Sequence, residues 1–420
     1  MPVEERYRWL EGLGEDGFLL LSVQNIIWHF EAQADRFGIA VSGGSDSMAL
    51  LHLMTRVAKE TGWSLRAVTV DHRLRPEAVG EAAFVAGVCD GLGIPHDVIE
   101  WQHGAIAGNL MEAARLARYR LMSEWAEAQG IANVALAHTA DDEAETFLMG
   151  LSRAAGLEGL SGMRRSFLEG SVTFRRPLLS HPRADLRSYL TRHGFAWVED
   201  PTNENDRFTR TKARRALKAL KPLGITVDRL FTVIHNLHMA QGVVDGAIQR
   251  AATEVISEAA GSLVFDRRAF MHLGPEPDRL LVRGMLGWMT GKSHAPRADQ
   301  LRNLHSALFK ERDATLSGCR FLHRHGKVYM VREPRAVGGP VPVGQVWDGR
   351  WLVEGPAGEV RALGAEGLRQ VPDWREAGVP REALLVTPGV WRGEVLLAAP
   401  LAGHSAGWQV RLQRPFTFSR

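Results

Sequence analysis

A glycine-rich turn near the start of the chain constrains its fold more than any other feature. The run Ile39-Ala40-Val41 favours a strand, Ser42-Gly43-Gly44-Ser45 a turn, and a helical pattern begins at Asp46. A strand that turns through glycines into a helix forms an anion site, because unpaired N–H groups and the positive end of the helix dipole face the turn. The glycines let an anion approach the backbone, and the serine hydroxyls can donate to it. The alternative is a turn that binds nothing.

The turn lacks the lysine of the GxxxxGK[ST] loop that kinases and GTPases use. A phosphate loop without this lysine indicates that pyrophosphate is held as a leaving group and that the nucleotide is cut at the α-phosphate. The pattern Ser-Gly-Gly-x-Asp-Ser after a strand resembles the pyrophosphate loop (PP-loop) of the N-type ATP pyrophosphatase superfamily. The resemblance implies ATP as a substrate, bound by Ser42, Gly43, Gly44, Ser45, Asp46 and Ser47, with Asp71 and His72 after the next strand.

Strand and helix patterns alternate through the first half of the chain. Strands are predicted at 39–41, 65–70, 96–100 and 133–137, and helices at 46–61, 76–92, 109–129 and 141–152. This series predicts an α/β fold with a doubly wound, Rossmann-like parallel sheet, whose ligands lie at the carboxyl ends of the strands. Further helical patterns cover 227–256 and 276–289, and a hairpin pattern covers 322–331. Three domains are expected: a PP-loop catalytic domain (1–215), a mainly helical domain (216–333) and a small β-rich C-terminal domain (334–420).

Composition excludes several classes of protein. The chain has 420 residues, a net charge of +3 and two cysteines, Cys89 and Cys319. Two distant cysteines form neither a disulfide framework nor a zinc-finger site. The first residues lack a signal-peptide pattern, and the apolar stretch 18–30 is too short and too polar to span a bilayer. A cytoplasmic protein without a membrane partner is expected.

Four further motifs narrow the choice within the superfamily. They cover residues 70–75 (VDHRLR), 109–119 (NLMEAARLARY), 137–160 (with AHTADDEAET and LSRAAGLEGL) and 199–210. Together they closely resemble the tRNA(Ile)-lysidine synthetase family over about residues 39–214. At two positions the chain departs from the family's pattern: Ala154 stands where the family usually has glycine, and Thr211 where it usually has asparagine.

The resemblance implies a two-step reaction of ATP, L-lysine and an isoleucine tRNA with the anticodon CAU. In the first step, O2 of the wobble cytidine (C34) attacks ATP and gives an adenylated base and pyrophosphate. In the second step, the lysine amine attacks C2 and expels AMP. The product pairs with A instead of G, so the tRNA changes its identity from methionine to isoleucine.

The first step needs cations that neutralise charge on the leaving group. Mg²⁺ binds one or two carboxylates together with phosphate oxygens, and Asp46 and Asp141 are the candidate ligands because both are expected at the same sheet edge. Arg115 and Arg118 share a helix face and are candidates for the phosphate oxygens, with Arg115 favoured by the resemblance. The alternatives are acids that only stabilise helix N-termini and a solvated basic face.

The second step needs an amine site and a base. Asp141, Asp142 and Glu145 form an acidic cluster, in which Asp141 and Glu145 share one helix face. His138 is the only nearby group that ordinarily titrates near neutral pH, so it is the candidate base. The alternatives are a satisfied histidine at a strand end and plain acids at a helix start.

A run of basic residues without an acid follows the fourth motif. Its candidates for tRNA phosphates are Arg207, Arg210, Lys212, Arg214 and Arg215. The alternatives are a solvated helix and ion pairs with acids such as Asp228 or Asp245. The helical and β-rich domains are expected to extend the tRNA footprint.

Two other functions compete with lysine ligation. tRNA 2-thiolation shares the loop and the class of substrate, but it needs a persulfide cysteine or an iron–sulfur cluster. Cys89 lies in an apolar helical context and Cys319 lies far outside the loop domain. A non-catalytic RNA-binding relative is expected to have lost loop residues that this chain keeps.

Overall fold

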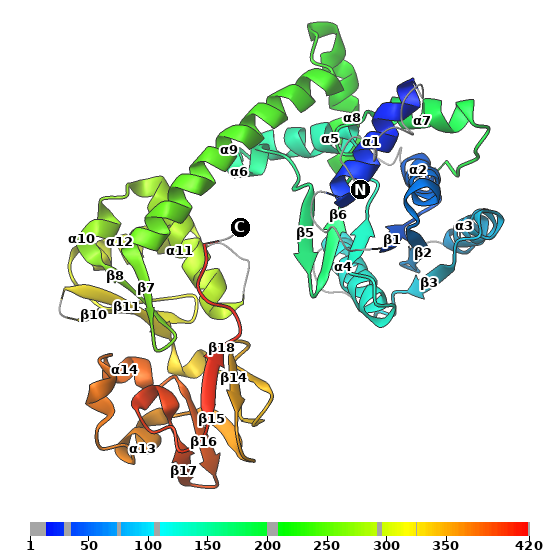
Figure 1. Ribbon diagram of the computed structural model, residues 1–420. Coiled ribbons are helices and arrows are strands. Elements are labelled where there is room, and N and C mark those ends of the chain that lie inside the picture. The colour runs from blue at the N-terminus through cyan, green and yellow to red at the C-terminus, as the bar shows by residue number, and fades with distance from the viewer. Residues whose placement is uncertain are drawn as a thin grey trace. The chain divides into compact units, whose positions relative to one another are not determined.

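The computed structural model describes residues 14–28, 35–73, 77–104, 110–199, 209–291, 296–324 and 326–418. The chain forms two compact units, Met1–Gln241 and Gly242–Arg420 (Figure 1). Within the described ranges, no helix is both long enough and apolar enough to cross a membrane. The division into three domains remains a prediction.

A six-stranded sheet forms the centre of the first unit, in the strand order β3-β2-β1-β4-β6-β5. Five strands are parallel, which confirms the predicted doubly wound sheet: β1 (Arg36–Ala40), β2 (Ser64–Asp71), β3 (His96–Glu100), β4 (Asn133–Ala135) and β6 (Val172–Arg175). β5 (Ser166–Glu169) adds an antiparallel edge next to β6. The sequence prediction lacks this hairpin, whose strands are only four residues long.

Helices cover both faces of this sheet. Side chains alternate between the two faces along each strand, so apolar strands contribute to a core on each face. In β2, Ala67 belongs to the core on one face and Val68 to the core on the other. The first core is completed by α1 (Glu15–Trp28), α2 (Ser45–Thr61), α3 (Ala78–Leu92) and α7 (Arg183–Arg192). The second core is covered by α4 (Leu110–Ala128).

A third cluster of the first unit lies beyond the end of β4. It joins α5 (Ala140–Leu151) and α6 (Leu157–Leu160) to α8 (Thr209–Leu220) and to the first turns of α9 (Val227–Val255). The predicted helices at 46–61, 76–92, 109–129 and 141–152 correspond to α2, α3, α4 and α5, with ends that differ by at most two residues.

The second unit contains the C-terminal part of α9, from Gly242 on, and a five-stranded antiparallel sheet in the order β7-β8-β11-β10-β9. The predicted hairpin is confirmed by β10 (Cys319–Arg324) and β11 (Lys327–Arg332), and the predicted helix at 276–289 by α11 (Pro275–Thr290). The same part of the chain also forms β9 (Ala314–Leu316) of this sheet and the helices α10 (Arg267–Met271) and α12 (Ala298–Phe309).

One hairpin interrupts a region that the sequence predicts as mostly helical. β7 (Ile256–Ala259) and β8 (Ser262–Asp266) pair around Ala260 and Gly261. Both turn residues have positive φ, 47° and 70°. The turn ends the helical pattern, and Leu263 and Phe265 join the core of the unit.

The β-rich C-terminal region is confirmed. One sheet has four strands: β12 (Val341–Pro342), β15 (Glu359–Ala362), β16 (Pro388–Arg392) and β17 (Val395–Ala398). A second sheet has three: β13 (Val346–Trp347), β14 (Trp351–Glu354) and β18 (Gln409–Leu412). Two short helices accompany them, α13 (Gly364–Arg369) and α14 (Arg381–Leu384).

Candidate active site

The glycine turn between β1 and α2 is closed by its own serines. Gly43 has a φ of +86°, a conformation that favours glycine. The Ser47 hydroxyl accepts a hydrogen bond from the Ser42 N–H (3.1 Å) and donates one to the Gly44 carbonyl (3.0 Å). Gly44 is the N-cap of α2 and brings no side chain to it. The turn therefore has the predicted geometry, with the N-terminal end of α2 pointing at it.

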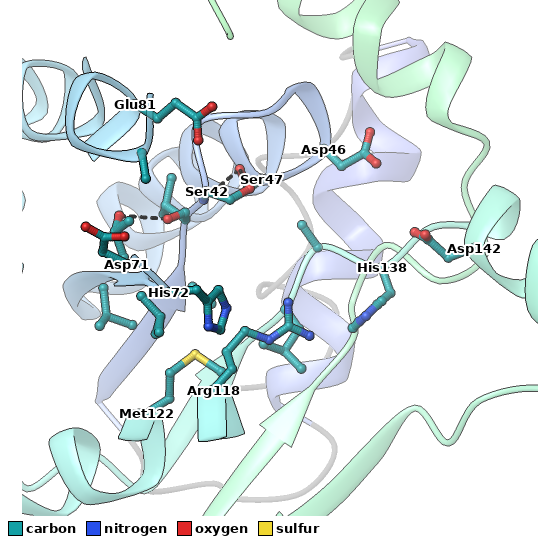
Figure 2. Close-up of a pocket in the computed structure, with 18 of the residues that line it drawn as sticks. Ser42, Asp46, Ser47, Asp71, His72, Glu81, Arg118, Met122, His138 and Asp142 are labelled. Atoms are coloured by element: carbon teal, nitrogen blue, oxygen red, sulfur yellow. Dashed lines mark hydrogen bonds between the residues drawn. The ribbon is translucent and has the colours of Figure 1, made fainter. Parts of the chain in front are cut away.

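A cavity of about 430 Å³ opens beside this turn at the carboxyl ends of β1, β2 and β4. Figure 2 shows Ser42 and Ser47 on one side of it and His138 and Asp142 on another. The wall also contains an apolar section, with Val68, Val70, Met122 and Leu136. Nine of the predicted site residues line it: Ser42, Asp46, Ser47, Asp71, His72, Arg118, His138, Asp142 and Arg214.

Some predicted residues lie elsewhere. Arg115 pairs with Glu112 of the same helix (2.6 Å) with about half of its side chain exposed, whereas Arg118 lines the cavity. Figure 2 shows the Arg118 guanidinium between His72 and His138. The Asp141 carboxylate accepts the backbone N–H of Arg183 (2.7 Å), and the cavity is lined by Asp142 in its place. Arg207, Asn109 and most of the motif at 199–210 lie outside the described residues.

Arg183, at the start of α7, is a site residue that the sequence prediction missed. Its Nε donates to Oδ2 of Asp46 (2.8 Å), while its terminal nitrogens lie 3.6 Å from Asp142 and 3.7 Å from Glu145. One arginine thus links the glycine loop to the acidic cluster of α5. The pattern Pro182-Arg183 signals a helix start, but nothing in the sequence relates it to acids 38 to 137 residues earlier.

Burial and the neighbouring arginines set the charges of these acids. Burial raises the pKa of Asp46 above its usual range, although Arg183 opposes the shift. Burial likewise raises the pKa of Glu145, against the pull of Arg214, whose Nε lies 2.6 Å from its Oε1. For Asp142, burial is outweighed by Arg183, by His138 and by the Thr139 N–H, and its pKa is lowered.

His138 differs from the base that the sequence predicts. Burial lowers its pKa to about 3, so the ring is neutral at neutral pH. Arg176, which directly follows β6, donates from Nε to the ring Nδ1 (3.1 Å). A ring with so low a pKa and an occupied Nδ1 is a poor proton acceptor.

The basic helix α8 divides into an inner and an outer part. Arg214 lies in the cavity wall and pairs with Glu145. Ion pairing was the alternative to a tRNA contact for Arg214, and Arg214 pairs with Glu145 of α5. Arg210, Lys212 and Arg215 are exposed, and Arg210 is near enough to His138 and Asp142 to lower the pKa of both.

The chain is similar to known proteins along most of its length. The PP-loop domain family matches residues 20–220. A tRNA(Ile)-lysidine synthase from Ruegeria pomeroyi is 43% identical over 404 residues, which cover 94% of this chain and 96% of that protein. The enzymes of that name from Hyphomonas neptunium and Wolbachia pipientis wMel are 36% and 33% identical, over 73% and 79% of this chain and 83% and 80% of their own lengths.

Proposed function

The chain belongs to the tRNA(Ile)-lysidine synthase family, and we propose that it ligates lysine to C2 of the wobble cytidine of a CAU-anticodon tRNA(Ile). ATP activates the base: cytidine O2 attacks the α-phosphorus, pyrophosphate leaves, the lysine amine attacks C2 and AMP leaves. One observation carries the proposal. The cavity that begins at the lysine-free phosphate loop also contains the acids that an amine needs.

For the first step, we assign pyrophosphate to the loop at 42–47 and the adenine to the apolar section of the wall. The N-terminal end of α2 favours the negative charge that builds up on the leaving group. Arg118 replaces Arg115 as the proposed phosphate partner, because it lines the cavity.

Mg²⁺ fits this site through Asp46, because the ion binds one or two carboxylates together with phosphate oxygens. Asp46 lies in the cavity wall at the start of α2. Asp141 is absent from the cavity lining and accepts the Arg183 backbone N–H, so Asp46 is the carboxylate that we assign to the ion. The bound ion would neutralise charge on the triphosphate.

For the second step, we propose that Asp142 receives the lysine amine, with Glu145 behind it. Asp142 is buried and its pKa is lowered, so its carboxylate is ionised at neutral pH. An ammonium group is then stabilised next to it. Glu145 is 1% exposed and tied to Arg214, so it holds the wall of the site in place.

Thiolation is not favoured by the cysteines. Cys89 is buried in the first core of the sheet, and burial raises its pKa to about 11. Cys319 is buried in the core of the second unit, and burial raises its pKa to about 12. Reactive cysteines need a lowered pKa and access.

The test is an incubation of the protein with α-labelled ATP, Mg²⁺, labelled lysine and a CAU-anticodon tRNA(Ile) transcript. AMP and tRNA-bound lysine are the expected products, and ADP as the main product would contradict the proposal. Asp46→Asn should slow AMP formation by at least about a hundredfold, the effect of losing a preorganised electrostatic group. Asp97→Asn is the matched control, because this acid pairs with Arg66 at the edge strand β3 and should leave the rate unchanged.

A further inference from the structure

The contact between Arg176 and His138 determines which ring nitrogen of the histidine carries a proton. Arg176 is 8% exposed and its Nε lies 3.1 Å from Nδ1 of His138. A guanidinium has donors and no acceptor. Nδ1 must therefore accept, and the proton of the neutral ring lies on Nε2.

Arg176 is itself held by partners from several segments. One terminal nitrogen donates to the Arg164 carbonyl (2.5 Å), and the guanidinium lies over the Phe167 ring, 4.6 Å from its centroid. The Tyr119 hydroxyl of α4 is a further hydrogen-bond partner. These contacts fix the direction of Nε, because the guanidinium is planar and its donors keep a fixed geometry.

The charges around His138 favour the neutral ring. Asp142 of α5 faces it with a charge that stabilises the imidazolium, but Arg176, Arg118 of α4 and Arg210 of α8 act against it, and burial adds to them. Since His138 lines the cavity, its Nε2–H is a donor at that wall.

We infer that Arg176 is a positioning residue that fixes His138 in the Nε2–H tautomer, so that His138 donates a hydrogen bond to an oxygen of the substrate instead of accepting a proton. The acceptor class is a phosphate or carbonyl oxygen, both of which occur in the first step of the proposed function, on which this assignment of the acceptor rests. No proton changes place: the Nε2–H stays on the ring and the oxygen is stabilised by the hydrogen bond.

The tautomer is measured without any substrate. In the full-length protein labelled with ¹⁵N-histidine, the His138 signals are identified by their loss in His138→Gln. A protonated Nε2 and an unprotonated Nδ1, unchanged between pH 8 and pH 5.5, are expected. A protonated Nδ1, or an imidazolium within this range, would overturn the inference.

Two arginine variants separate positioning from packing. Arg176→Met should give a mixture of tautomers for His138 and a ring that titrates closer to pH 6.5. Arg175→Met is the matched control: Arg175 is the last residue of β6, directly before Arg176, and is also buried, but its Nε donates to Asn133 (2.6 Å), so the His138 signals should not change. Equal changes in both variants, or none in Arg176→Met, would contradict the positioning role.

The donor function is tested by pyrophosphate release with ATP and tRNA. The amide N–H of His138→Gln can replace Nε2–H but cannot act as a base, so this variant should stay within about tenfold of the wild type, while His138→Ala should lose about a hundredfold, the cost of one missing donor. Equal losses in both variants would exclude the donor role. A wild-type protein that released no pyrophosphate would refute the proposed function and leave the tautomer standing.

Discussion

At the scale of single residues, the buried carboxyl group of Glu143 in α5 makes the free energy of unfolding depend on pH. Its Oε1 accepts the Met163 N–H (2.8 Å), while its buried Oε2 has no partner among the described residues. Burial raises the pKa of Glu143 from 4.5 to about 7. The folded protein therefore binds a proton between pH 4.5 and 7 that the unfolded chain has lost, so the free energy of unfolding falls as the pH rises through this window and is level above it.

Glu143→Gln should remove this slope. At pH 8 the variant should be more stable than the wild type by roughly 2–3 kcal/mol, since one pKa unit corresponds to about 1.4 kcal/mol, and at pH 5 the two should be similar. Urea unfolding at both pH values measures the difference. Glu60→Gln, at an exposed position of α2, is the control and should keep the wild-type slope. A variant that is destabilised equally at both pH values would contradict a buried proton.

The sequence identified site residues where local rules place them. Ser42, Asp71 and His138 lie at or just after the carboxyl ends of β1, β2 and β4 in one parallel sheet, so a common edge could be predicted. Arg183 could not be predicted, because its contact with Asp46 spans 137 residues and depends on how α7 packs on α2. The structure places Arg118 in the cavity wall, whereas the resemblance favours Arg115; helical spacing groups both on one face without saying which side chain enters a cavity.

At the scale of elements, the turn after α5 contains a strained residue. Ala154 has a φ of +52°, in the left-handed region, and it stands where the family usually has glycine. A Cβ there costs about 1 kcal/mol, so Ala154→Gly should stabilise the protein by about that amount in chemical unfolding. Ala216→Gly, at an exposed helical position of α8, should have the opposite sign at a similar size. Destabilisation by Ala154→Gly would contradict this account.

We expect the exposed basic residues of α8 and its cavity-lining Arg214 to have different roles. Lys212 and Arg215 are exposed, and we expect them to contact tRNA phosphates. Replacing both by alanine should weaken the binding of cognate and non-cognate tRNA alike, and should make the dependence of log K on log salt shallower by roughly one to two units. Arg214→Ala is the comparison: it removes the partner of Glu145, so it should lower catalysis and stability and leave the salt slope unchanged. The same slope in all three proteins would remove α8 from the tRNA site.

Element prediction succeeded for helices with long apolar patterns and for the short strands between them, and it missed two short hairpins. α2, with 17 residues, and α4, with 19, have room for a full period of apolar positions. The hairpins β5–β6 and β7–β8 have strands of four or five residues, too few to show alternation. The β7–β8 turn also contains Ala260 at positive φ, a conformation that its residue type does not reveal.

At the scale of the whole molecule, each compact unit has a core of its own. Phe174 is fully buried in the first unit and Phe321 in the second. Among the described residues, those that line the cavity lie between positions 40 and 214, in the first unit. A ligand that contacts these residues therefore stabilises the first unit directly.

We expect calorimetry of the full chain to show two unfolding transitions. Phe174→Leu should lower the midpoint temperature of the first unit's transition only, and Phe321→Leu that of the second unit's transition only. The two variants therefore show which transition belongs to which unit. Mg²⁺ and ATP at a hundred times the dissociation constant should stabilise the first unit by about 2.7 kcal/mol and leave the second transition where it is. A single transition that shifts as a whole on addition of ATP would contradict this expectation, because it would show that the two units unfold together.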